Sequence, residues 1–222
     1  MKKPWIWMLV FLGIVVIAGI IGVYAATNSD DDTGSGDAPS ADTYEGQPYL
    51  GDEDAEVKIV EFGDYKCPYC KDFTANTYPL IDKDLIETGK AKFYFVNYPF
   101  IHEDSKRSAE FAEVVYQELG NDTFWEFHDL LYEKQNPGEE QEEVYTEDYL
   151  VETLESIASE EEAQTVLEAY QNGEGEDAVE RDLDLVKEWG VTSTPALFID
   201  GERFEGSTHE DFVQAVEEAQ GE

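Results

Sequence analysis

The chain has 222 residues, of which 52 are acidic and 14 are basic, so its formal net charge at neutral pH is −38. This charge repels the phosphate backbone of nucleic acids, and we expect no nucleic-acid binding. Hydrophobic residues make up 41% of the chain and aromatic residues 13%, which is enough to form the core of one globular domain. Salt screens the repulsion between acidic groups, so the composition favours a salt-loving or similarly extreme habitat. A generically acidic secreted protein, or an acidic surface that recruits basic substrates, are the alternatives.

The N-terminal segment predicts a membrane anchor. Twenty uncharged, mainly apolar residues run from Trp5 to Tyr24 (WIWMLVFLGIVVIAGIIGVY), behind Lys2 and Lys3. The lysines place residues 1–4 in the cytoplasm and everything after residue 24 outside it. A cleaved signal peptide is the alternative, because Val23-Tyr24-Ala25 resembles a small-residue cleavage site.

Residues 25–47 contain mostly Ser, Gly, Asp, Thr and Pro, and we expect them to form a flexible acidic linker. The catalytic region is then an extracytoplasmic domain over residues 48–222.

The domain begins with a strand, a helix and a second strand. The first strand is Val57–Phe62 (VKIVEF), and Pro68 is suited to the first position of the helix. Tyr78-Pro79 predicts a kink in that helix, which should end at Gly89. The second strand is Lys92–Val96 (KFYFV).

A helical insertion over about residues 103–189 follows, because apolar residues recur there at helical spacing. Phe124, Trp125 and Phe127 fit a helix core better than a peptide groove. The strand signal returns at Ala196–Ile199, Asp200-Gly201 predicts a hairpin turn, and Glu210–Ala219 an amphipathic helix.

Cys67 and Cys70 are the only cysteines in the sequence. A cysteine at a helix N-terminus is stabilised as a thiolate, so Cys67 is expected to be the nucleophile and Cys70 the resolving thiol of dithiol–disulfide exchange. Lys66 and Lys71 are candidates to lower the pKa of Cys67 further. A structural disulfide would close too short a loop to stabilise much.

A zinc site would need His102, His128 or His209 as further ligands, and these are scattered in the sequence. We therefore expect no metal and no other cofactor.

Two further positions are candidates for the site. Thr194-Pro195 precedes a strand, where a cis peptide could expose backbone groups to an extended substrate, although local sequence alone favours a trans bond. Glu61 lies in an apolar strand, and burial would raise the pKa of its carboxyl and suit it to proton transfer. A Glu61 side chain that points outward is an equal alternative.

Three sequence stretches together carry a family resemblance: EFGDYKCPYC from residue 61, FVNYPF from residue 95 and GVTSTPALFIDG from residue 190. With them, the chain from about Tyr49 to Ala219 resembles the exported DsbA-like thiol-disulfide oxidoreductases of the thioredoxin superfamily, and it looks closest to their membrane-anchored Gram-positive branch.

The resemblance implies an α/β thioredoxin fold with a helical insertion, with Pro195 in cis beside the cysteines. It also implies that Glu61 mediates proton transfer. The residues expected to contact substrate are Thr194, Pro195, Pro68 and Tyr69.

The implied activity is the introduction of disulfides into translocated proteins, with thiol-containing exported proteins as substrates and a membrane quinone-linked thiol oxidase for reoxidation. The Pro68-Tyr69 dipeptide departs from the Pro-His of the best-known members and equals that of glutaredoxins. An exported reductase, for instance of apocytochrome thiols, is therefore the first alternative, and a non-catalytic chaperone-like binding module is the second.

Overall fold

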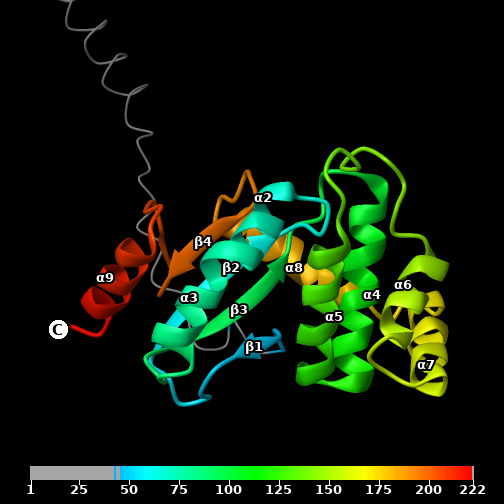
Figure 1. The fold of residues 1–222 in the computed structure, drawn as a ribbon, viewed down its shortest axis with the longest axis horizontal. Helices are drawn as coiled ribbons and strands as arrows, with labels where there is room; N and C mark the ends of the chain where they lie inside the picture. The colour runs from blue at the N-terminus through cyan, green and yellow to red at the C-terminus, as the bar shows by residue number, and fades with distance from the viewer. Residues whose placement is uncertain (1–42, 44–45, 222) are drawn as a thin grey trace, which may run out of the picture. The chain divides into compact units, whose positions relative to one another are not determined.

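The computed structural model describes residue 43 and residues 46–221. Its centre is a five-stranded sheet in the order β1-β3-β2-β4-β5 (Figure 1). Strands β2 (Val57–Gly63) and β3 (Ala91–Asn97) are parallel, and β4 (Ala196–Ile199) is antiparallel to β2. Two short strands, β1 (Tyr49–Leu50) and β5 (Glu202–Arg203), complete the edges. The sequence did not predict β1.

The helix after β2 runs from residue 68 to residue 86 as alternating α-helical and π-helical turns. These are α2 (Pro68–Asp72), η2 (Phe73–Thr77), α3 (Tyr78–Ile81) and η3 (Asp82–Ile86). Pro79 has no N–H to donate, and the wider π-helical turn closes just before it, where the Tyr78 N–H donates to the Phe73 carbonyl. The predicted interruption at Pro79 is confirmed.

The two faces of the sheet have separate cores because side chains alternate along β2. Val57 and Ile59 pack under the α2–η3 helix and α9 (His209–Ala219). Val60 and Phe62 pack on the opposite face, against Val186 of α8 (Glu176–Glu188). Glu61 and Gly63 therefore point to the same face as Val57 and Ile59.

The helical insertion is confirmed between β3 and β4. It contains α4 (Glu103–Leu119), α5 (Asn121–Lys134), α6 (Glu147–Glu155), α7 (Glu160–Gln171) and α8, and α4 to α7 stand together beside the sheet (Figure 1). Phe124, Trp125 and Phe127 are buried in the core, as the helical spacing predicted. The Asp200-Gly201 hairpin is also confirmed, because both residues have positive φ and the turn joins the paired strands β4 and β5.

One boundary differs from the sequence prediction. Gln47, expected to end the linker, is buried, and its amide donates to the Asp182 carboxylate at 2.6 Å. The packed domain thus includes this residue. The expected anchor at residues 5–24 and most of the expected linker lie outside the described residues. Among residues 43 and 46–221, no helix has the length and apolar character needed to cross a membrane.

Candidate active site

The loop that joins β2 to α2 is fixed by the carboxylate of Asp64. One of its oxygens accepts from the Lys66 N–H at 2.8 Å, and the other accepts from the N–H groups of Phe100 and Ile101 at 2.9 and 3.0 Å. The Cys67 N–H donates to the Asp64 carbonyl at 2.8 Å. These contacts set the direction in which the chain enters the helix.

Cys67 caps the N-terminus of α2, and its sulfur accepts from the Cys70 N–H at 3.4 Å. Hydrogen bonding from the Cys70 thiol is the main cause that lowers the pKa of Cys67, from 9.0 to about 6. Contacts with Thr194 and with the N–H groups of Cys70 and Tyr69 act in the same direction, while burial opposes them. Cys67 therefore carries the more acidic thiol of the pair.

Cys70 lies inside the domain, with no exposed surface, and both cysteines are free thiols. Burial is the main cause that raises the pKa of Cys70 well above its ordinary value. The two thiols therefore differ in acidity, because the Cys67 sulfur ionises readily and the Cys70 sulfur retains its proton. Thiol–disulfide exchange uses this difference.

The loop before β4 lies against Cys67. The Thr194–Pro195 peptide bond is cis, and the Cys67 thiol donates to the Thr194 carbonyl at 3.4 Å. The Thr194 hydroxyl is buried and has no partner among the described residues while Cys67 is protonated. Once Cys67 is a thiolate, that hydroxyl can donate to it. Pro68 and Tyr69 are exposed beside the thiol, with Tyr69 73% accessible to solvent.

Glu61 lies at the centre of the sheet, between Phe95 on β3 and Leu197 on β4. It is 1% exposed, so the alternative of an outward-facing side chain is wrong. Burial, and then the negative charge of the Cys67 thiolate, raise the pKa of Glu61 well above its ordinary value. A raised pKa favours the protonated carboxyl more than in an exposed glutamate, which suits Glu61 to proton transfer.

The expectation that Lys66 and Lys71 activate Cys67 is not supported, because both ammonium groups are engaged elsewhere. Lys66 is buried and lies 3.4 Å from the Asp104 carboxylate, and it donates to the Glu142 carbonyl at 2.6 Å. Lys71 donates to two carbonyls at the end of α5. Neither lysine is among the main causes that shift the pKa of Cys67.

Two residues of the insertion hold the active-site loop, and the sequence analysis missed both. The Gln135 amide donates to the carbonyls of Tyr65 and Cys67 at 2.7 and 3.3 Å. The Tyr145 hydroxyl donates to the same Tyr65 carbonyl at 2.8 Å. They lie 68 to 80 residues along the chain from these partners, and no local pattern marks them.

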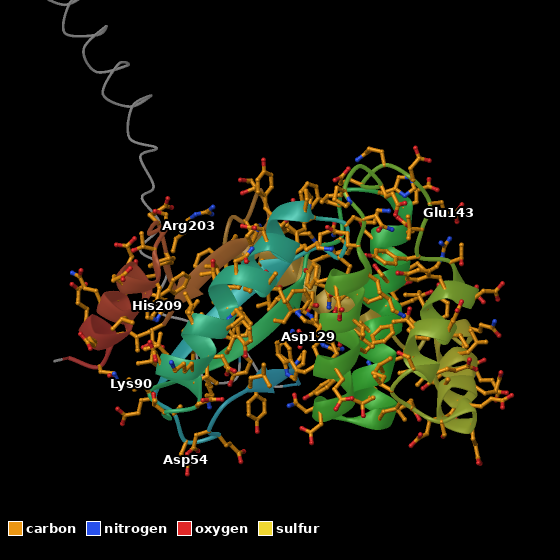
Figure 2. The ribbon with its side chains drawn as sticks, viewed as in Figure 1. Asp54, Lys90, Asp129, Glu143, Arg203 and His209 are labelled. Carbon is orange, nitrogen blue, oxygen red and sulfur yellow. The ribbon has the colours of Figure 1, made fainter. Side chains whose placement is uncertain are left out.

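The three histidines do not join the cysteines. His102 contacts Asp104 at 2.7 Å, and His128 is buried beside the Tyr65 hydroxyl at 3.2 Å. His209 pairs with Asp84 at 3.2 Å, and it lies on α9, at the opposite end of the domain from Glu143 in the insertion (Figure 2). Within the described part of the chain, no three or more His, Cys, Asp or Glu side chains are grouped so that they could hold a metal ion.

These features define a thiol-disulfide oxidoreductase: an acidic thiol caps a helix, a second thiol is buried three residues later, and a proline loop lies beside the first thiol. Comparison with known proteins agrees. The thioredoxin family model matches residues 43–218. Disulfide bond formation protein D of Bacillus subtilis is 37% identical over 172 residues, which cover 78% of this chain and 76% of that protein. Probable disulfide bond formation protein D of Bacillus cereus is 32% identical over 190 residues, with 86% and 84% coverage.

Among solved structures, oxidised BdbD from Bacillus subtilis superimposes with a TM-score of 0.75 and 33% identity, covering 83% of this chain and 97% of that one. The chain belongs to the DsbA-like thiol-disulfide oxidoreductases of the thioredoxin superfamily.

Proposed function

We propose that this protein is an exported disulfide oxidase that passes a Cys67–Cys70 disulfide to thiol-containing proteins outside the cytoplasm. The observation that carries the direction is the lowered pKa of Cys67. A stabilised thiolate stabilises the reduced form of the pair and so makes its disulfide a stronger oxidant. The relatives named disulfide bond formation protein D support the same direction.

In the proposed cycle, a substrate thiolate attacks the sulfur of Cys67 in the disulfide. The Cys67–Cys70 bond breaks, the electron pair leaves on Cys70, and Cys70 takes up a proton. A second substrate thiolate then attacks the substrate sulfur of the mixed disulfide, and Cys67 leaves as a thiolate. The substrate dithiol is oxidised to a disulfide, and the protein disulfide is reduced to a dithiol.

The surroundings of Cys67 suit an extended substrate. Tyr69 and Pro68 offer exposed surface next to Cys67 in the chain, and the Thr194–Pro195 loop contacts the thiol. We assign these four residues to substrate contact and Cys67 to the sulfur that exchanges with substrate. During reoxidation the Cys67 thiolate attacks the oxidising partner, and Cys70 resolves the mixed disulfide formed there. Glu61 is assigned to proton exchange with Cys70, because its carboxylate is one of the charges that raise the pKa of this thiol.

The apolar run at residues 5–24 supports a single membrane anchor with residues 1–4 in the cytoplasm, and residues 25 to about 46 supply the linker to the domain. In this arrangement the domain reaches newly translocated proteins. A membrane quinone-linked thiol oxidase returns the Cys67–Cys70 dithiol to the disulfide after each cycle.

The test is the reduction potential of the pair, measured at equilibrium with glutathione. An oxidase should be markedly more oxidising than thioredoxin, whose potential is about −270 mV. A value at or below that of thioredoxin would favour an exported reductase, the reading suggested by the glutaredoxin-like Pro68-Tyr69 dipeptide. Thiol trapping in intact cells provides an independent check, because an oxidase is held mostly as the disulfide.

Two variants test whether the protein is a catalyst at all. Cys67→Ser should abolish disulfide transfer, because it removes the sulfur that exchanges with the substrate. Cys70→Ala should accumulate mixed disulfides on Cys67, because Cys70 can no longer attack them and release the partner. A Cys70→Ala protein that captures no substrate would instead favour the chaperone-like binding module.

A further inference from the structure

The hydroxyl group of Tyr132 is buried beside the active site without a hydrogen-bond partner. Tyr132 lies on α5 and is 1% exposed, and no described residue accepts from or donates to its hydroxyl. Leaving a buried hydroxyl unpaired typically costs about 1–3 kcal/mol, so such a group calls for an explanation. A bridging water is the usual one.

The place of this hydroxyl is fixed by Gly63 on β2. A Cβ atom added to Gly63 would overlap the Phe95 ring and lie 3.0 Å from the Tyr132 oxygen, so the missing side chain leaves space for this ring and for the hydroxyl beside it. Glu61 precedes Gly63 by two residues and points to the same face of the strand. Its Oε1 atom is also buried without a partner among the described residues. Two unpaired polar groups thus share one face of β2.

Both groups lie within electrostatic reach of Cys70. The charge of the Glu61 carboxylate helps to raise the pKa of Cys70. After burial, the negative charges of Cys70 and Glu61 are the strongest causes that raise the pKa of Tyr132. These three side chains therefore form one buried polar cluster, which we call the Cys70 cluster.

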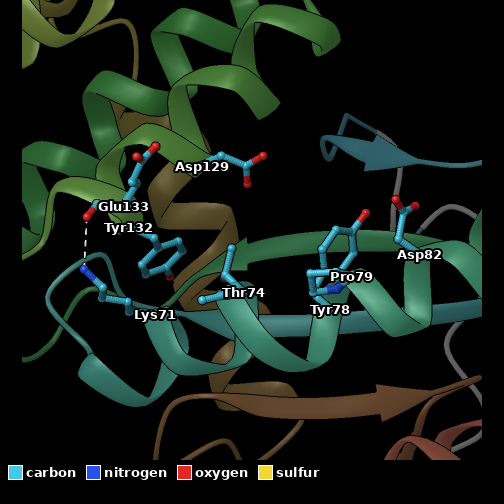
Figure 3. Close-up of a pocket in the computed structure, with 9 residues that line it drawn as sticks. Lys71, Thr74, Tyr78, Pro79, Asp82, Asp129, Tyr132 and Glu133 are labelled. Carbon is cyan, nitrogen blue, oxygen red and sulfur yellow. Dashed lines mark hydrogen bonds between the residues drawn. The ribbon is translucent and has the colours of Figure 1, made fainter.

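A solvent-open groove borders this cluster. It lies between the α2–η3 helix and α5, has a volume of about 420 Å³, and is lined by residues that include Lys71, Thr74, Ala75, Tyr78, Asp129 and Tyr132. Figure 3 shows Tyr132 projecting from α5 to lie between Lys71 and Thr74. Tyr132 contributes to the wall of the groove, while its hydroxyl lies in the interior above Gly63. It is thus placed between the groove and the Cys70 cluster.

The exchange reaction requires a proton route at this point. When the disulfide is reduced, Cys70 leaves as a thiolate and takes up a proton, although its exposure is 0%. Glu61 can supply that proton but is itself 1% exposed, so it must be reprotonated from elsewhere. Hydroxyl groups and bound waters carry protons between such sites.

We propose that Tyr132 is a positioning residue whose hydroxyl holds water between the groove and Glu61, so that the proton of Cys70 is exchanged with solvent through this groove. The proposal rests on Cys70 as the buried thiol of the proposed cycle. It does not depend on the direction of the cycle, because a reductase would release the same proton along the same route.

The test compares Tyr132→Phe with the wild-type domain. The rate at which a reduced dithiol peptide reduces the Cys67–Cys70 disulfide is followed by quenching and alkylation, across a pH series and in both light and heavy water. We expect a rate about tenfold lower at neutral pH, with a larger solvent isotope effect and an altered pH profile. The pKa of Cys67, read from thiolate absorbance, should not change.

Tyr78→Phe is the matched control, because it removes a second tyrosine hydroxyl from the same groove and should react as the wild type does. Ala75→Phe tests the groove itself. Ala75 is exposed on the groove wall, and the larger ring should slow the reaction several-fold by excluding water.

A Tyr132→Phe rate, isotope effect and pH profile equal to those of the wild type would overturn the role of the hydroxyl. An unchanged Ala75→Phe rate would overturn the groove as the entry. Failure of the proposed function looks different, because in that case the wild-type disulfide itself would not exchange with the peptide.

Discussion

Replacing Thr194 by valine should raise the pKa of Cys67. Valine keeps the shape of the side chain but removes the hydroxyl that can donate to the thiolate. A hydrogen bond to a charged group is worth about 1.5–3 kcal/mol, and we take the lower end of this range, about 1.5 kcal/mol. That energy corresponds to about one pKa unit, so the pKa should rise from about 6 to about 7.

The same change should make the protein a weaker oxidant. At neutral pH, a smaller thiolate population in the reduced form lowers the reduction potential by about 20 mV. Thiolate absorbance against pH gives the pKa, and equilibration with glutathione gives the potential. Ser193→Ala is the control, because Ser193 is exposed and is not among the groups that shift the pKa of Cys67. An unchanged or lower pKa of Cys67 in Thr194→Val would refute the assignment of the hydroxyl.

Three further outcomes can be measured by unfolding. Lys66→Met should lower the free energy of unfolding in urea by about 1–3 kcal/mol, because the buried Asp104 carboxylate loses its ammonium partner but still accepts from the Val144 and Tyr145 N–H groups. An unchanged free energy of unfolding would contradict a stabilising role for this pair. Burial lowers the pKa of His128 to about 3, whereas in the unfolded chain its pKa is about 6.5. Between these pH values the unfolded state binds one more proton than the folded state, so stability falls as the pH drops. His128→Phe should therefore lose less stability than the wild type on acidification, and an equal pH slope would contradict the assignment. The melting temperature should rise with salt, since salt screens the charge of −38, and a falling melting temperature would argue against a salt-loving protein.

The parts of the fold that could be predicted are those with a local signal. β-branched and aromatic runs mark β2, β3 and β4, and Asp200-Gly201 marks the hairpin because both positions adopt positive φ. Strand β1 has two residues, too few for an alternating pattern, and it exists because Tyr49 and Leu50 pair with β3. It could not be found without the tertiary structure.

The site divides in the same way. Cys67, Cys70 and Pro68 are marked by spacing, whereas the burial of Glu61 depends on which face of β2 the helices cover. Lys66 looked like an exposed activating charge, because its partner Asp104 lies 38 residues further along the chain. A lysine before a helix is usually solvated, and burial of its ammonium group requires a charged partner, which for Lys66 is distant in the sequence.

The helical insertion completes the active site in addition to enlarging the domain. Gln135 donates to the backbone carbonyls of Tyr65 and Cys67 just before α2, and Tyr145 donates to the carbonyl of Tyr65. These long-range contacts restrain the loop that carries Cys67. The insertion therefore acts on the Cys67 thiol through the backbone of the loop. Substitutions of Gln135 or Tyr145 should alter the reactivity of Cys67 although both cysteines are kept.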